Sequence, residues 1–309
     1  MTTPPSGQEG YRPAETMRLV AAGRNILAFY DGRDQRIDCA AATAAGFDGE
    51  TLGLGIASYA VVSGEEALVY DTHISLAHGA RVRDQLAGLG VERIRVVYSH
   101  WHHDHVAGAG AFADCEIIAN ERTRDRLIEH RADLQSGARH PAIDPLVMPT
   151  TIFRDRLALT VGAVPVVLVH ADIHSDDETL ALLPESRQLI AGDCLEDTIT
   201  YVAEPEGLQR HIAELDRIAE LPFDRILPCH GSYEQIAAGG YQRTFIRATQ
   251  QYVRMLLRMR REPELREMPL KELIQGPLLA GWIEYHAPYE AVHRSNVARV
   301  AALAGDGAA

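Results

Sequence analysis

One short stretch, Ser99–Gly108, gathers side chains that are suited to binding metal ions. It reads SHWHHDHVAG and places four histidines and one aspartate within positions 100–105. Neutral imidazole is a nitrogen ligand that suits zinc, and a carboxylate adds an anionic oxygen ligand. In an extended loop, side chains two residues apart point to the same side, so His100 and His102 can converge on one ion. Asp104 and His105 point elsewhere, which suits a second ion nearby.

The residues on either side of this motif predict a strand-to-helix loop. Ile94–Tyr98 is rich in β-branched and aromatic residues, as in a buried strand. Val106–Phe112 is small and apolar, as at the start of a helix. Loops of this kind are where an α/β sheet usually presents its chemistry. His103 and Trp101 are expected to face away from the metal ions and to pack on the loop or cap it.

The order H-x-H-x-D-H resembles the signature of the metallo-β-lactamase-fold hydrolases, a superfamily that uses two metal ions between two β-sheets. The resemblance extends over about residues 50–235 and implies three further ligands, in the order His, Asp, His. The segment HSDDETLALLPESRQLIAGD supplies His174 and Asp193, and DRILPCHGS supplies His230. His170, four residues before His174, is the alternative for the first of these positions.

The resemblance also implies the fold class and the domain organisation. We expect an α/β protein with a four-layer αββα sandwich, in which two mixed sheets lie between outer helices. Residues 1–235 would form this catalytic core, with residues 1–15 as a frayed leader. Residues 236–309 would form a helical C-terminal extension packed on the same domain.

The same resemblance implies a dinuclear metal centre with two Zn²⁺ ions per chain, or alternatively iron or manganese. One ion would take His100, His102 and His174, the other Asp104, His105 and His230, and Asp193 would bridge them. Neither ion is saturated by protein, so water completes the coordination and supplies a hydroxide nucleophile near neutral pH. Asp104 is expected to orient this hydroxide or to pass a proton.

Three further residues are predicted to support the centre or to line the substrate pocket. The segment Ile56–Thr72 reads as a β-hairpin that ends at Asp71. By resemblance, Asp71 supports the metal loop through hydrogen bonds, although a turn-forming aspartate at a strand end is the alternative. His73 and Tyr201 are candidates for lining the substrate pocket.

The remaining chain predicts alternating helices and strands. Helices are expected over Ala77–Leu89, Glu121–Leu134, Glu206–Leu221 and Tyr233–Arg261, the last broken or kinked near 239–240. Strands are expected over Cys115–Ala119, Thr151–Leu159, Val164–Val169, Gln188–Ala191 and Arg225–Leu227. The loop Ser136–Thr150 either arches over the site or is an ordinary connector.

The substrate class is narrowed only in part by the residues. Asp193 resembles the glyoxalase II and lactonase branches, whereas β-lactamases usually have Cys or Ser at that position. We therefore expect hydrolysis of a carboxylic ester-type bond (a thioester, a lactone or a simple ester) in a small molecule. The alternatives are a β-lactam-hydrolysing enzyme of the same fold and a non-hydrolytic, iron-dependent redox or dioxygenase member.

Composition and charge exclude other classes of partner. The formal net charge of −13 over 309 residues offers no basic stripe to nucleic acid. Four scattered cysteines indicate reduced thiols, and no run approaches the roughly 20 apolar residues of a membrane helix. The N-terminal residues lack the basic and apolar regions of a signal peptide. We expect a cytoplasmic protein with a small-molecule substrate and a possible homodimer, in which Met255–Met259 packs in the core or at the dimer face.

Overall fold

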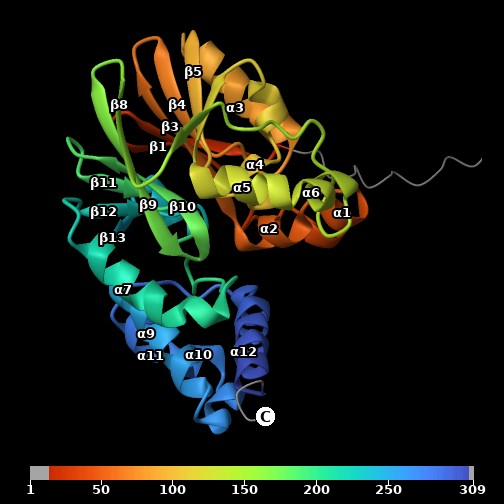
Figure 1. Cartoon of the computed structure of the whole chain (residues 1–309), viewed down its shortest axis with the longest axis vertical. Coiled ribbons are helices and arrows are strands. Elements are labelled where there is room, and N and C mark those ends of the chain that lie inside the picture. Colours follow the sequence, from red (N-terminus) through yellow and green to blue (C-terminus); the bar gives the residue numbers. More distant parts are fainter. Residues whose placement is uncertain (1–13, 306–309) are drawn as a thin grey trace, which may run out of the picture.

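Two β-sheets form the centre of the molecule (Figure 1). The computed structural model describes residues 14–305, so the expected leader lies largely outside the described residues. In the first sheet the strands follow chain order: β1 (Arg18–Gly23), β2 (Ile26–Asp31), β3 (Ile56–Ser63), β4 (Glu66–Tyr70), β5 (Arg93–Val97), β6 (Glu116–Asn120) and β7 (Thr151–Phe153). Strands β1 to β4 pair antiparallel, and β4 to β7 pair parallel. The predicted hairpin is β3 and β4, with Ser63 opposite Glu66.

The second sheet has the order β13-β12-β11-β10-β9-β8. Its strands are β8 (Arg156–Val161), β9 (Val164–Ile173), β10 (Ser175–Leu183), β11 (Gln188–Ile190), β12 (Arg225–Leu227) and β13 (Tyr241–Gln242). All neighbours pair antiparallel except β11 and β12, which are parallel. The two sheets are therefore both mixed, as predicted.

Helices cover the outer face of each sheet. The longer ones are α3 (Leu76–Gly88), α5 (Glu121–Glu129), α7 (Leu208–Ala219), α9 (Thr244–Met259) and α12 (Tyr289–Gly305). The short ones are α1 (Cys39–Ala44), α2 (Gly49–Leu54), α4 (His103–Val106), α6 (Arg131–Ser136), α8 (Tyr233–Ala237), α10 (Leu270–Leu273) and α11 (Gln275–Leu279). The larger apolar cores lie between the sheets and beneath the helices on each side, and a smaller one lies around α1 and α2. The predicted four-layer αββα sandwich is confirmed.

Tyrosines of the first sheet form hydrogen bonds to a strand and a loop of the second half. Tyr30 donates a hydrogen bond to the carbonyl of Gly231 at 2.8 Å, and Tyr70 donates one to the carbonyl of Thr179. Both tyrosines are fully buried, so their hydroxyls need such partners. Strand β10 and the loop that follows β12 are thereby held against the first sheet.

Two expected elements differ in their boundaries. The predicted strand Thr151–Leu159 divides at residues 154–155, so that β7 joins the first sheet and β8 opens the second. The chain crosses between the sheets here, and one straight strand cannot pair in both. The predicted helix over 121–134 is interrupted at His130, which ends α5 and precedes α6.

The segment after residue 233 also breaks at its glycines, but not as a kinked helix. Gly239 and Gly240 have φ values of +94° and +96°, a region that favours glycine. The chain turns there, and β13 pairs with β12 before α9 begins. The second sheet therefore includes residues beyond 235, which is the predicted C-terminal boundary of the catalytic core.

The C-terminal helices share one apolar core with the second sheet. This core joins β9 to β11 with α7, α9 and α12. Within residues 14–305, no helix is long and apolar enough to cross a membrane.

A substitution in α9 tests whether the helical extension unfolds together with the sandwich. Phe245 is fully buried and stacks on Tyr241 of β13, with ring centroids 4.3 Å apart. Phe245→Ala should lower the free energy of unfolding by about 3–5 kcal/mol, because it leaves a cavity in the shared core. Urea unfolding followed by circular dichroism should show one transition at a lower midpoint. A separate early transition confined to the helices would contradict a shared unit.

Candidate metal centre

The histidine motif follows β5, an interior strand that lies between β4 and β6 in the first sheet. Asp71, at the end of β4, accepts a hydrogen bond from the backbone N–H of Ser99 at 2.6 Å. His102 is the N-cap of α4, so the helix starts at position 103, three residues earlier than the sequence predicts. Asp104 therefore lies in the first turn of a helix, and its direction differs from that of His100 and His102 for this reason.

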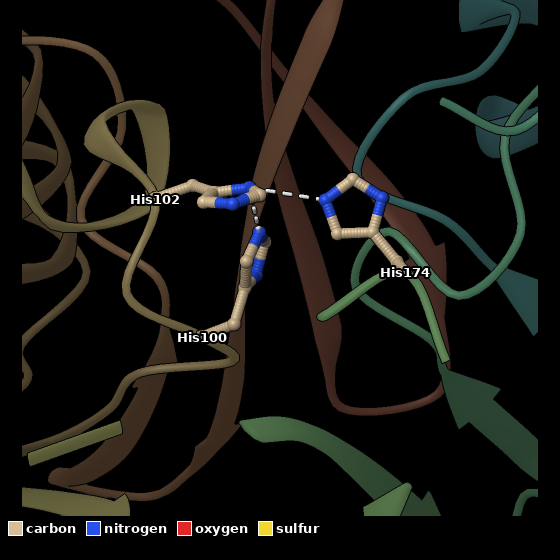
Figure 2. Close-up of side chains that lie close together, drawn as sticks. All are labelled: His100, His102 and His174. Carbon is tan, nitrogen blue, oxygen red and sulfur yellow. Dashed lines mark hydrogen bonds between the residues drawn. The ribbon is translucent and has the colours of Figure 1, made fainter. Parts of the chain in front are cut away.

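Three histidines from two distant segments converge on one point (Figure 2). The Nδ1 of His102 lies 2.9 Å from the Nε2 of His100 and 3.0 Å from the Nε2 of His174. The Nδ1 of His174 is 3.2 Å from the carbonyl oxygen of Tyr201. Since a carbonyl only accepts hydrogen bonds, the proton of His174 lies on Nδ1 and its Nε2 presents a lone pair to the centre.

A second group lies beside the first and contains the charged ligands. The Nε2 of His230 is 3.1 Å from the Oδ2 of Asp104, and its Nδ1 is 2.7 Å from the carbonyl oxygen of Gly55. The Oδ2 of Asp193 is 3.1 Å from the Nε2 of His105 and 3.4 Å from that of His230.

Asp193 also reaches the first group. Its Oδ2 lies 3.9 Å from the Nε2 of His100 and 3.8 Å from the Nε2 of His174. One carboxylate oxygen therefore stands between the three-histidine group and the second group. This is the place that a bridging ligand requires.

The two groups differ in charge. Burial lowers the pKa of His100 well below its usual range and that of His102 to about 3, which favours neutral imidazoles. Burial acts in the same direction on His105 and His230. There, however, the charges of Asp193 and Asp104 outweigh it and raise both pKa values well above the usual range. The second group thus attracts positive charge.

The donor set fits metal ions. Ring nitrogens of the three imidazoles face one another at 2.9–3.0 Å, an arrangement that a shared cation would stabilise. The Oδ1 of Asp193 is buried and makes no hydrogen bond. His174 and His230 each donate their other nitrogen to a backbone carbonyl, as metal-binding histidines commonly do. The structure brings all seven predicted ligands together, and their ligand role stays a prediction.

Asp71 holds the motif in place. Its Oδ2 lies 2.8 Å from the Nδ1 of His105, while its Oδ1 accepts from Ser99. Asp71 has a φ of +63°, as does His174. Residues other than glycine hold such a backbone at a cost of about 1–3 kcal/mol, and they persist where the surroundings enforce them. The support predicted for Asp71 is therefore seen as hydrogen bonds in the structure.

Asp71→Asn tests this support. The amide cannot accept a hydrogen bond on its nitrogen side, so one of the two contacts is lost and the His105 ring is less well fixed. We expect metal affinity or activity to fall about 10–100-fold, with the fold retained. A competitive titration against a chromophoric chelator measures the affinity. Unchanged affinity and activity would show that Asp71 only shapes the turn.

A buried carboxylate beside the centre, Glu178, was not singled out from the sequence. Glu178, on β10, is fully buried and its Oε2 lies 3.5 Å from the Nδ1 of His100. Gly192 has a φ of +53°, and a Cβ there would lie 1.9 Å from a carboxylate oxygen of Glu178. The signal for Glu178 is an ionisable residue directly before an otherwise apolar strand run.

His73 and His170 lie elsewhere. His73 was expected to line the pocket, but it is fully buried and stacks on His78, with ring centroids 4.5 Å apart. That expectation is wrong, because the turn after β4 directs the ring beneath the loop. His170 lies on β9, and its Nε2 is 2.8 Å from the carbonyl oxygen of Asp176. The structure thus brings His174, and not His170, to the centre.

A cavity of about 510 Å³ opens on the centre. Tyr201 lines it as predicted, and the loop that follows α6 reaches it through Arg139 and His140. Trp101 packs on the His130 ring and forms part of the wall. The opposite wall comes from α12 and includes Ala291, Val292, Ser295 and Arg299. The size suits a small molecule.

The fold and the cluster of histidine and aspartate side chains are those of one class of protein, and a family model identifies that class. The family model of the metallo-beta-lactamase superfamily matches residues 52–230. This chain belongs to that superfamily, whose members are largely metal-dependent hydrolases.

Individual relatives are distant. The chain is 24% identical over 209 residues to a linear primary-alkylsulfatase of a Pseudomonas species, covering 54% of this chain and 40% of that protein. It is 26% identical over 195 residues to a beta-lactamase-like protein 2 homolog of Drosophila melanogaster, covering 58% and 59%. The chain thus spans less than two thirds of the length of each of these relatives.

Solved structures share the fold. A metallo-beta-lactamase from Pontibacter korlensis superposes with a TM-score of 0.58 at 14% identity, covering 77% of this chain and 99% of that one. The metallo-beta-lactamase DIM-1 gives a TM-score of 0.55 at 19% identity, covering 77% and 96%.

Proposed function

We propose that this chain is a dinuclear zinc hydrolase that cleaves a carboxylic ester-type bond, in a thioester, lactone or simple ester, of a small molecule. The observation that carries the proposal is the position of Asp193. Its Oδ2 faces both ligand groups at one end of a cavity that is open to substrate.

The metal ions, Asp104 and the cavity wall would have different roles in hydrolysis. When bound, the two ions would polarise the scissile carbonyl and activate a water molecule at neutral pH. Asp104 is placed to orient this water or to pass a proton, because its side chain lines the cavity and is 16% exposed. Leu54, Trp101 and Val292 give the cavity an apolar wall, which excludes water and accepts a hydrocarbon part of the substrate.

A substrate panel tests the reaction class. Lactones, thioesters, aryl esters, β-lactams and alkyl sulfates should be offered to the zinc-loaded protein, and hydrolysis followed by absorbance or pH. The sulfates are included because of the similarity to an alkylsulfatase. We expect turnover of one of the first three classes. Turnover of sulfates or β-lactams alone would overturn the ester assignment.

Two histidine variants provide matched controls for this assay. His174→Ala removes a predicted ligand and should abolish turnover. His170→Ala removes a histidine four positions away that lies outside the cavity lining, and it should leave turnover unchanged. Metal content and the absorption spectrum of the same samples distinguish zinc from iron. An iron-loaded protein with redox activity and no hydrolysis would favour the dioxygenase alternative. A cytoplasmic location and a homodimer stay predictions.

A further inference from the structure

A second group of metal-binding side chains lies on the rim of the same cavity. It consists of Asp48, His103 and His140, and none of these belongs to the predicted metal centre. One ligand atom from each residue lies within 4.8 Å of the others. The three come from separate segments: the N-cap of α2, the first residue of α4, and the loop between α6 and β7.

The His103 ring has one nitrogen without a partner. Its Nε2 lies 2.8 Å from the carbonyl oxygen of Pro141, so Nε2 carries the proton and Nδ1 is left with a lone pair. The residue is only 4% exposed, and this buried Nδ1 makes no hydrogen bond. It points toward the Oδ2 of Asp48, 3.7 Å away. Two electron-rich atoms that face each other in a buried place repel, and a cation between them would remove this cost.

Both distances from Asp48 are longer than a usual hydrogen bond and close to the separation of two ligands on one metal ion. The Oδ2 of Asp48 is 3.7 Å from His103 Nδ1 and 3.4 Å from His140 Nδ1. Hydrogen bonds from nitrogen to oxygen span about 2.7–3.2 Å. Two ligands of one tetrahedral zinc ion, each at about 2.0–2.2 Å from it, lie about 3.3–3.6 Å apart. The contact of His103 with the carbonyl of Pro141 is the outer hydrogen bond that metal-binding histidines usually make.

Asp48 and His140 can serve such an ion without disturbing the fold. The Oδ1 of Asp48 caps α2 by accepting from the backbone N–H of Thr51 at 2.9 Å, which leaves Oδ2 for the ion. The His140 side chain is 54% exposed, and its ring is nearly parallel to that of His103, at 18°. Closure on one ion therefore requires the exposed His140 ring to turn toward Asp48.

We propose that Asp48, His103 and His140 form a third divalent-cation site, suited to Zn²⁺, that fastens the loop after α6 to the rim of the cavity. The loop contributes both a ligand, His140, and the carbonyl that orients His103. Arg139, next to His140, lines the cavity, so occupancy of the third site fixes the position of a residue beside the substrate.

Metal counting on the full-length protein tests the proposal. Each protein is equilibrated with a range of buffered Zn²⁺ concentrations, and bound zinc per chain is measured by mass spectrometry. We expect the unmodified protein to bind one ion more than His140→Ala and Asp48→Asn at the upper end of the range. Both variants should fold, because His140 is exposed and asparagine is as good an N-cap as aspartate.

His130→Ala is the matched control. His130 lines the same cavity and stacks on Trp101, but it lies outside the three-residue group. It should keep the additional ion. The result depends on the difference between variants and not on the number of ions in the main centre, so failure of the dinuclear assignment would leave it readable. Equal zinc counts in the unmodified protein, His140→Ala and Asp48→Asn would overturn the third site.

Hydrogen exchange tests the fastening of the loop. Raising Zn²⁺ over the range that fills the third site should slow exchange of the backbone amides of residues 137–143 in the unmodified protein. His140→Ala should show no such slowing. Exchange that is insensitive to zinc in the unmodified protein would overturn the role in the loop.

Discussion

Asp104→Asn should lower kcat/KM for hydrolysis by about 10²–10⁴-fold while the protein stays folded. Asparagine keeps the shape of the side chain, but it removes the negative charge and the ability to hold a proton. Asp104 faces the Nε2 of His230 at 3.1 Å and lines the cavity. The loss should therefore fall on the chemical step as well as on the second ion. His105→Ala should have a similar effect, because it removes a ligand of the same ion.

The measurement is steady-state kinetics on the substrate found in the panel, with circular dichroism as the check on folding. Asp133→Asn is the control, since Asp133 lines the same cavity but is exposed and belongs to neither ligand group. It should retain full activity. Full activity in Asp104→Asn would rule out the two-metal mechanism.

Asp193→Ala should lower the zinc content of the main centre from two ions to one or none per chain. Its Oδ2 stands within 3.9 Å of one imidazole nitrogen on each of four histidines, so its removal takes away a ligand that both groups share. Loss of this negative charge also removes the largest of the charges that raise the pKa of His105 and His230. Activity should be lost together with the metal.

Zinc per chain is counted after dialysis against a weak chelator, which empties weaker sites. Asp176→Ala is the control, because Asp176 pairs with Arg122 and Arg126 at the surface of β10. This variant should keep both ions. Two tightly held ions in Asp193→Ala would refute the bridging role.

Much of the site could be predicted because its ligands are rare residue types in a fixed order. The H-x-H-x-D-H run resembles one superfamily, and the order of the later His, Asp and His follows from the same resemblance. The strand Arg225–Leu227 and the hairpin before Asp71 were predictable from local pattern, since β-branched residues and a turn with Gly64 mark them. The fold class followed from these elements and the resemblance.

Other features depended on contacts between distant segments. His73 turns inward because the backbone after β4 has a positive φ, which no residue type at 73 reveals. Glu178 reaches His100 only when β10 packs against the motif loop. The wall that α12 contributes to the cavity joins residues nearly 200 positions from the motif.

Local sequence thus indicated which side chains are candidate ligands and in what order they occur, because residue type and spacing are properties of the chain itself. The packing of the two sheets decided where those side chains meet, how far apart the two groups lie, and which residues line the cavity. These are distances between segments far apart in the chain, and only the packed cores and the tyrosine hydrogen bonds between the halves fix them.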